Sequence, residues 1–494
     1  MLLQSDTTNR QLMTTFHLGA FIRLPLAPWT MSDYSPGYHS PSIAQYGYTL
    51  SAQPPPPINS IPIELLGEIF AECLRNVYIC KGYADEPRIT NSPSRSSDPM
   101  TLAQVCGHWR AVALSMPTLW ASMSIGSPRR GHLALTRLWL ERSGVCPLHI
   151  RLYQLSDSGV EYAITNELIT LLATQVHRWR SIEFRFEGKF QTALSQIPRR
   201  SLTCLKSATV YIVGAGWEFV SVDTLWRIIH ETPALRQVYW ESDYITRMPP
   251  HIPWMQLTAI HIVGQLSTST AFEILYACQN VIDLDIFISK NTITPSAPAT
   301  LPHLRHLSIQ SRCPLNPIFD QLILSQISSL RLIRCDIPII PEEFDSLENL
   351  LRRSRCNLTR LSFGDIRLEE VGNGALTVLR LPSMSHLNDL QIVTPVGDQV
   401  IRALTYQSRH SQSDILPMLE KLSIEECRTT PGTLSGMVSS RVAPSNGLLN
   451  LRFLEVETWD MNAMDAEVLK GLGDGGLHMK IDYDIESAYD RYLS

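Results

Sequence analysis

A recurring spacing of apolar residues constrains the fold of this 494-residue chain more than any other feature. Each unit has an apolar residue, two free positions, a second apolar residue, one free position and a third apolar residue. The pattern occurs at Val145/Leu148/Ile150, Trp179/Ile182/Phe184, Leu205/Ala208/Val210, Leu235/Val238/Trp240, Leu257/Ile260/Ile262, Val281/Leu284/Ile286, Leu304/Leu307/Ile309, Ile327/Leu330/Leu332, Leu358/Leu361/Phe363, Leu387/Leu390/Ile392, Leu419/Leu422/Ile424 and Leu451/Leu454/Val456. Successive units begin 22 to 34 residues apart. Self-similarity at such a period predicts a stack of repeated structural units, each packed on its neighbours.

The free position between the second and third apolar residues identifies the repeated element as a β-strand. Its occupants are His149, Glu183, Thr209, Tyr239, His261, Asp285, Ser308, Arg331, Ser362, Gln391, Ser423 and Glu455, and none of them is aliphatic. A strand with one buried and one exposed face requires this alternation, because successive side chains point to opposite faces. The further triplet Trp120/Met123/Ile125 predicts an entry strand before the first unit.

Amphipathic helices are expected between the strands. Residues 341–356 place Phe344, Leu347 and Leu350 on one stripe and Glu342 and Glu343 in the first turn, where the helix dipole favours acidic residues. Residues 223–229, 269–278, 317–327 and 398–404 have the same pattern. We therefore expect an α/β solenoid with parallel strands on the concave face and helices on the convex face. This arrangement resembles a divergent leucine-rich repeat, whose units are about 20 to 29 residues long.

Two amphipathic stretches precede the solenoid. In the first, Leu65, Leu66, Ile69 and Phe70 form an apolar stripe. The second is expected to be one helix that begins after Pro99 and is stopped by Met116-Pro117, with a stripe made of Leu102, Val105, Cys106, Trp109, Val112 and Ala113. Two short helices bury too little surface to be stable alone. Their stripes must therefore pack on the rest of the chain or on another protein.

The ordered residues of this region resemble an F-box, the helical module that docks on the Skp adaptor of SCF ubiquitin ligases. The matching residues are Ile61-Pro62 with Glu64-Leu65-Leu66 and Ile69-Phe70, then Val105-Cys106 with Trp109-Arg110 and Ala113, then Pro117, Leu119 and Trp120. Ile61 stands where the family usually has Leu, and a polar insert at about residues 77–99 separates the two helices. Such inserts resemble those of the large fungal F-box families.

The resemblance implies a non-catalytic substrate receptor of a ubiquitin ligase, acting in the cytoplasm, the nucleus or both. Its expected partners are the Skp adaptor, a cullin reached through that adaptor, and a protein target held by the solenoid. The adaptor-binding residues that it implies are Pro62, Leu65, Leu66, Ile69, Phe70, Leu102, Val105, Cys106 and Trp109. The alternative is a scaffold or protein-binding module outside any ligase, in which these helices only cap the solenoid. Coverage of Leu65, Ile69 and Val105 by residues 126–180 would favour the scaffold.

Three domains follow from these patterns. Residues 1–58 are rich in Ser and Pro and are expected to be a flexible arm, residues 59–125 are the F-box-like part, and residues 126–494 are the solenoid with its C-terminal cap. Strand-centre positions are the candidate contacts for a target, on geometry alone. They are Tyr239, His261, Asp285, Arg331, Gln391 and Glu455.

Composition argues against several other functions. A formal net charge of -5 offers no broad basic face for nucleic acid. No apolar run approaches the roughly 18 residues of a membrane helix, so no membrane association is expected. Ten cysteines without a CxxC pair or a Cys/His cluster predict reduced, mostly buried thiols and no metal site.

No catalytic motif is evident, so no catalytic residue and no cofactor are predicted. The glycines of 471–476 match a dinucleotide-binding spacing by letter, but they follow a helical segment and open no βαβ unit. Adjacent acids such as Glu342-Glu343 are poor acid/base partners and are expected on the solvated surface. A hydrolase or transferase would need a deep polar pocket with convergent histidines and carboxylates.

Overall fold

The computed structural model describes residues 61–74, 99–154, 156, 158–187, 191–213, 219–240, 248–292, 297–335, 341–365, 372–406, 415–442, 451–457 and 463–482. Every described residue belongs to the second of two units into which the chain divides, Pro57–Ser494. The expected arm of residues 1–58, most of the polar insert and residues 483–494 lie outside the described residues.

One sheet of fourteen parallel strands runs through the second unit in the order of the sequence. Its strands are β1 (Ser122–Gly126), β2 (Leu148–Gln154), β3 (Trp179–Glu187), β4 (Ser207–Val213), β5 (Gln237–Trp240), β6 (Ala259–Ser267), β7 (Asp283–Lys290), β9 (His306–Ser311), β11 (Ser329–Arg334), β12 (Arg360–Asp365), β13 (Asp389–Val396), β14 (Lys421–Cys427), β15 (Phe453–Glu457) and β16 (His478–Asp482). The short strands β8 (Ala299–Thr300) and β10 (Leu322–Ile323) form a separate parallel pair. This sequential order gives an α/β fold of solenoid-like topology.

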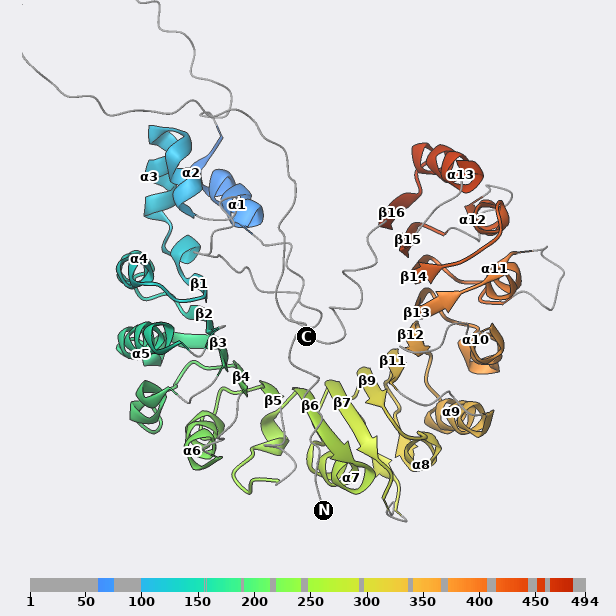
Figure 1. Cartoon of the computed structure of the whole chain (residues 1–494), viewed down its shortest axis with the longest axis horizontal. Coiled ribbons are helices and arrows are strands. Elements are labelled where there is room, and N and C mark those ends of the chain that lie inside the picture. The colour runs from blue at the N-terminus through green and yellow to red at the C-terminus, as the bar shows by residue number, and fades with distance from the viewer. Residues whose placement is uncertain are drawn as a thin grey trace, which may run out of the picture. The chain divides into compact units, whose positions relative to one another are not determined.

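Helices connect the strands and lie along one side of the sheet (Figure 1). The described α-helices are α1 (Ile63–Leu74), α2 (Pro99–Val105), α3 (Gly107–Ser115), α4 (Arg130–Arg142), α5 (Gly159–Ala173), α6 (Phe219–His230), α7 (Thr268–Ala277), α8 (Asn316–Phe319), α9 (Pro341–Ser354), α10 (Gly372–Leu379), α11 (Asp398–Leu404), α12 (Thr433–Val442) and α13 (Ala463–Asp474). Short 3-10 helices occur at Pro117–Trp120, Val176–Arg178, Thr192–Gln196, Trp254–Gln256 and Pro382–Met384. We call the side of the sheet opposite the helices the inner face. None of the described helices is long and apolar enough to cross a bilayer.

The register of the sheet aligns the repeat units with one another. Leu284 pairs with Leu307, and Leu330 pairs with both Leu307 and Leu361, so equivalent apolar residues stack along the ladder. Backbone hydrogen bonds just before each strand hold the same register. Between β4 and β5, for example, two successive N–H groups donate to the Lys206 carbonyl at 2.8 and 3.0 Å, and this double contact recurs between consecutive strands as far as β15.

The apolar triplets form one continuous core, as the repeat pattern predicts. Every triplet contributes a strand to the main sheet, and the entry strand predicted at Trp120/Met123/Ile125 is β1. All the triplet residues are buried except Val145, which is 93% exposed. The core continues from Leu66 in α1 to Leu477 before β16. Residues 57–494 are thus one compact unit without a break at residue 125.

The expected register of β2 is wrong by two residues. Ile150 pairs with Met123 and Ile182, so Ile150 occupies the second apolar position of its unit and not the third. The strand-centre residue is therefore Arg151 instead of His149. The β2 sequence alternates buried and half-buried residues throughout, so the triplet pattern fits it at two different offsets.

Two expected elements differ at other places in the solenoid. The helix predicted at 317–327 is reduced to the four residues of α8 and is followed by β10. The last strand, β16, was not predicted, because Gly476 stands where its unit needs the first apolar residue. The predicted helices at 223–229, 269–278, 341–356 and 398–404 correspond to α6, α7, α9 and α11.

Two expectations about burial are also wrong. Glu343 is 3% exposed and forms an ion pair with Arg334, whereas the sequence pattern placed it on the solvated surface. Its contact with Arg334 offsets the cost of burying the carboxylate. Of the nine described cysteines, all free, only Cys278, Cys313 and Cys427 are buried.

The second N-terminal stretch forms two helices instead of the single helix expected. Cys106 has extended backbone (φ −157°, ψ 172°) and ends the run of helical residues after α2. Its Sγ accepts a hydrogen bond from the Trp109 N–H at 3.4 Å and so caps α3. Met116 ends α3, as the sequence predicts.

Aromatic contacts join these helices to the solenoid. The Phe70 and Trp109 rings lie 4.8 Å apart, between α1 and α3. The Trp120 indole N–H donates to the Ala113 carbonyl at 2.9 Å, and the Trp120 ring packs edge-on against Trp139 of α4 at 4.9 Å. Since Trp120 and Trp139 are fully buried, α1–α3 are packed on the first repeat.

Candidate functional site

The stripe of α1 divides into a buried half and an exposed half. Leu66 and Phe70 are 0% exposed and belong to the core. Leu65 and Ile69 are 58% and 44% exposed. Because they are four residues apart, these two side chains lie on one face of the helix. The chain therefore holds α1 in place with one half of the stripe and leaves the other half in solvent.

The stripe of α2 divides in the same way. Leu102 is buried, whereas Val105, the last residue of α2, is 59% exposed. Cys106 and Trp109 are half-buried, and Pro62 is exposed. We call Leu65, Ile69 and Val105 the apolar face. All three side chains keep about half of their surface in solvent, so the described residues, including those of 126–180, do not bury them.

This division corrects the expected set of adaptor-binding residues. Leu66, Phe70 and Leu102 are core residues and offer no accessible surface to a partner. Ile63, which was not predicted, is 53% exposed. Periodicity alone cannot separate the two halves, because both belong to one stripe and only tertiary packing decides which half is covered.

Acidic side chains line one side of the exposed part of α1. Glu64, Glu68 and Glu72 are all exposed, and α1 carries no basic residue. The apolar face thus has an acidic border, which favours a partner with an apolar groove and basic residues at its edge.

The second candidate surface is a row of polar side chains across the inner face. Tyr239 pairs with His261 and His261 with Asp285, while Arg331 pairs with Ser308 and Ser362. The row continues through Gln391 to Glu455 and Lys480. All six predicted target contacts therefore occupy the same register position, on six strands between β5 and β15. His261 is buried and the other five are half-buried.

Pairs of side chains connect the row at its first strands. Arg151 Nε lies 2.9 Å from Glu183 Oε2, and Arg185 Nε lies 3.5 Å from Glu183 Oε1. Burial and the neighbouring Glu183 raise the pKa of Tyr153, which lies beside these ions. This end of the row is held rigid by ions of both signs.

The middle of the row contains an aromatic and acidic cluster. The Tyr239 and His261 rings are stacked with centroids 6.0 Å apart, and His261 Nδ1 lies 3.9 Å from Asp285 Oδ2. Burial alone would lower the pKa of His261, but the neighbouring carboxylates of Asp285 and Asp283 outweigh it and raise that pKa. Burial raises the pKa of Asp283.

Hydrogen bonds continue along the later strands. Ser362 donates to Gln391 at 3.1 Å, and Gln391 donates to Glu425 at 2.7 Å. Lys480 lies 2.6 Å from Glu455. The pKa of Glu455 is lowered, because Lys480 and its neighbours outweigh the opposing effect of burial. Hydrogen bonds and ion pairs therefore join polar side chains of the inner face across neighbouring strands.

A partly buried histidine relay was missed by the sequence reasoning. His251 Nε2 lies 3.1 Å from Asp223 Oδ1, and His230 Nδ1 lies 2.9 Å from His251 Nδ1. The His230 ring stacks on Trp226 at 5.2 Å, and burial, with a contribution from His251, lowers its pKa well below the usual value. His230 Nε2 contacts no hydrogen-bonding group, so the described residues supply no nucleophile for the relay. The separation of these residues along the chain gave no signal for the contact.

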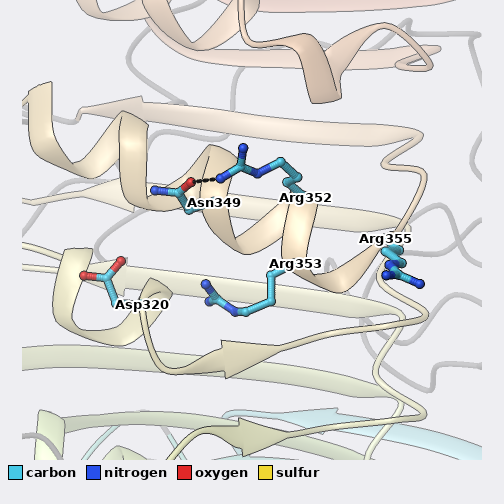
Figure 2. A pocket seen from close by; sticks show the side chains of 5 residues that line it. All are labelled: Asp320, Asn349, Arg352, Arg353 and Arg355. Atoms are coloured by element: carbon cyan, nitrogen blue, oxygen red, sulfur yellow. Dashed lines mark hydrogen bonds between the residues drawn. The ribbon is translucent and has the colours of Figure 1, made fainter.

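A pocket of about 490 Å³ lies beside the end of α9 and is lined by Asp320, Asn349, Arg352, Arg353 and Arg355 (Figure 2). Arg353 donates to the Phe319 and Leu322 carbonyls at 2.7 and 2.8 Å, and Arg352 donates to Asn349 at 2.8 Å. Cations in the last turn also suit the helix dipole. Its lining combines one carboxylate, Asp320, with three arginines and one amide, and brings no histidine together with a carboxylate. Within the described part of the chain, no three His, Cys, Asp or Glu side chains converge on a metal position.

The comparisons with known proteins add no family to this geometry. A scan against models of known protein families finds no match, and a search of curated proteins finds none either.

Proposed function

We propose that this chain is the substrate-recognition subunit of an SCF-type ubiquitin ligase, with α1–α3 as an F-box and the inner face as the holder of a protein target. The observation that carries the proposal is the exposure of the apolar face. Leu65, Ile69 and Val105 remain in solvent although the chain has a large core in which apolar side chains are buried. This exposure argues against the alternative in which α1–α3 only cap the solenoid.

The proposed contact is a helix laid into an apolar groove of the Skp adaptor. The buried half of the α1 stripe keeps the exposed half in a fixed orientation, so little ordering entropy is lost on binding. The acidic border of Glu64, Glu68 and Glu72 would pair with cations at the edge of the groove.

The proposed subunit performs no bond chemistry. It raises the local concentration of its target near a ubiquitin-conjugating enzyme, which is recruited through the adaptor and a cullin. Such a complex would act in the cytoplasm, the nucleus or both. The polar, preorganised inner face supports the role of target holder.

The test is the affinity of the purified chain for the Skp adaptor. The side chains of the apolar face are about half exposed, so docking would bury about half of each, and truncation to Ala would cost about 1 kcal/mol per site. The triple variant Leu65→Ala/Ile69→Ala/Val105→Ala should then bind roughly 100-fold more weakly. Leu66→Ala is unsuitable because it would damage the core.

The matched control is the triple variant Val160→Ala/Met255→Ala/Met418→Ala, which truncates exposed apolar residues elsewhere. It should bind the adaptor as the unaltered chain does. The scaffold alternative would be favoured if the apolar-face variant binds the adaptor as tightly as the unaltered chain, or if the unaltered chain does not bind the adaptor.

A further inference from the structure

Three cations occupy equivalent positions at the start of three neighbouring strands. Arg180 lies at the start of β3, Lys206 directly precedes β4, and Arg236 directly precedes β5. The Lys206 N–H donates to the Arg180 carbonyl and the Arg236 N–H to the Lys206 carbonyl, both at 2.8 Å. We call these three residues the basic column. Adjacent strands are about 4.8 Å apart, so the column spans about 10 Å.

The basic column is the longest run of cations at this position. The same position on later strands holds Thr258, Ile282, Arg305, Ser328, Thr359, Asn388, Glu420 and Arg452. There, Arg305 and Arg452 stand between or beside residues without positive charge. Three adjacent cations are therefore a local feature of β3–β5 in a chain whose net charge is -5.

Two of the three cations of the column, Lys206 and Arg236, have exposed side chains. Arg180 is half-buried. The Arg236 guanidinium donates to the Pro233 and Leu235 carbonyls at 2.9 and 2.7 Å, which fixes its position without neutralising it. In the part of the chain that the structure describes, no carboxylate forms an ion pair with Lys206 or Arg236.

Neighbouring residues extend the surface. Ser181, Ser207 and Gln237 follow the three cations, pair with one another in register and are half-buried. Their side chains can exchange hydrogen bonds with the backbone of a ligand. In the turn before β4, Arg200 is exposed, whereas its neighbour Arg199 is paired with Glu231 at 3.1 Å.

We infer that the basic column binds an extended acidic peptide segment. At about 3.3 Å per residue, three or four residues of extended peptide match the length of the column. A nucleic acid would need a longer basic stripe, but the next two positions are Thr258 and Ile282. No residue of the apolar face takes part, so this inference is independent of adaptor docking.

The experiment measures binding of fluorescein-labelled hexaglutamate to the full chain by fluorescence anisotropy at low ionic strength. Each exposed ion pair changes affinity by about 1.4- to 5-fold. Lys206→Gln/Arg236→Gln should therefore weaken binding roughly 2- to 25-fold, and added salt should weaken the binding of the unaltered chain. Lys206→Arg should retain it.

The matched control is Arg305→Gln/Arg452→Gln, which removes the same charge from the same position on other strands. It should leave hexaglutamate affinity unchanged, with far-UV circular dichroism confirming that both double variants are folded. The inference is overturned if the unaltered chain does not bind hexaglutamate, or if the control loses as much affinity as the column variant. Tighter binding of a labelled oligothymidylate of equal charge would also overturn it.

Discussion

Arg334 and Glu343 form a buried ion pair that joins consecutive parts of the solenoid. Arg334 ends β11 and Glu343 lies in the first turn of α9, with side chains 1% and 3% exposed and an Nη2–Oε1 distance of 3.1 Å. Glu343 also accepts a hydrogen bond from the Leu315 N–H, and Arg334 donates to the Cys313 carbonyl. The pair thus holds β11, α9 and the segment after β9 together.

We predict that Glu343→Leu destabilises this part of the solenoid by about 3–5 kcal/mol, because it leaves the Arg334 guanidinium buried without a counter-ion. Repeat arrays open locally, so native-state hydrogen exchange is the suitable assay. The stated cost corresponds to amide exchange in β11 and α9 that is roughly 150- to 5,000-fold faster.

Two further variants complete the design. Arg334→Met/Glu343→Leu removes both charges and should exchange more slowly than Glu343→Leu. Glu342→Leu, at the exposed neighbouring position, should change exchange little. The reasoning is refuted if Glu343→Leu accelerates exchange by less than about tenfold, or if the double variant is no better protected than the single one.

Two other predictions concern the inner face. A Cβ at Gly364 would lie 2.7 Å from Val393 Cβ, so Gly364→Ala should destabilise the fold by about 1–3 kcal/mol. A Cβ at Gly126 would meet no other atom within 4 Å, so Gly126→Ala should change the free energy of unfolding by no more than about 0.5 kcal/mol. Equal changes for the two variants in urea unfolding would contradict this reasoning. Because the pKa of His261 is raised on folding, its protonation stabilises the fold below the unfolded pKa of about 6.5, and this contribution is lost as pH rises through the folded pKa. His261→Gln should remove this pH dependence from the hydrogen-exchange protection of the amides in β6 and β7, whereas the control His306→Gln should retain it. An unchanged pH dependence in His261→Gln would refute the assignment to His261.

The sheet was largely predictable because its units repeat. Apolar positions such as Leu284, Leu307 and Leu330 recur at the same offsets, so one local rule locates each strand and its buried face. The rule fails where a unit breaks it. Gly476 replaces the first apolar residue of the last unit, so the pattern does not predict β16. The alternation in β2 is long enough for the triplet to fit at two positions, so the pattern places the strand centre two residues too early.

Contacts between distant residues were not predictable. Cys106 continues the apolar spacing of its neighbours, so the sequence conceals the turn that it makes between α2 and α3. Two such contacts, Arg334 with Glu343 and His230 with His251, form only because the repeat units pack against one another. The apolar stripe of α1 was predicted, but which half remains exposed depends on packing against α3 and the 3-10 helix Pro117–Trp120.

The proposed docking of α1 on the Skp adaptor is tested most directly by the reactivity of two thiols. Cys73 and Cys204 are exposed, and Cys73 lies four residues after Ile69, on the same side of α1. Alkylation is followed by mass spectrometry with and without saturating adaptor. We predict that the adaptor slows alkylation of Cys73 at least about tenfold and leaves Cys204 unchanged, since a thiol reacts only where it is accessible. An unchanged rate at Cys73 in the presence of the adaptor would contradict the account.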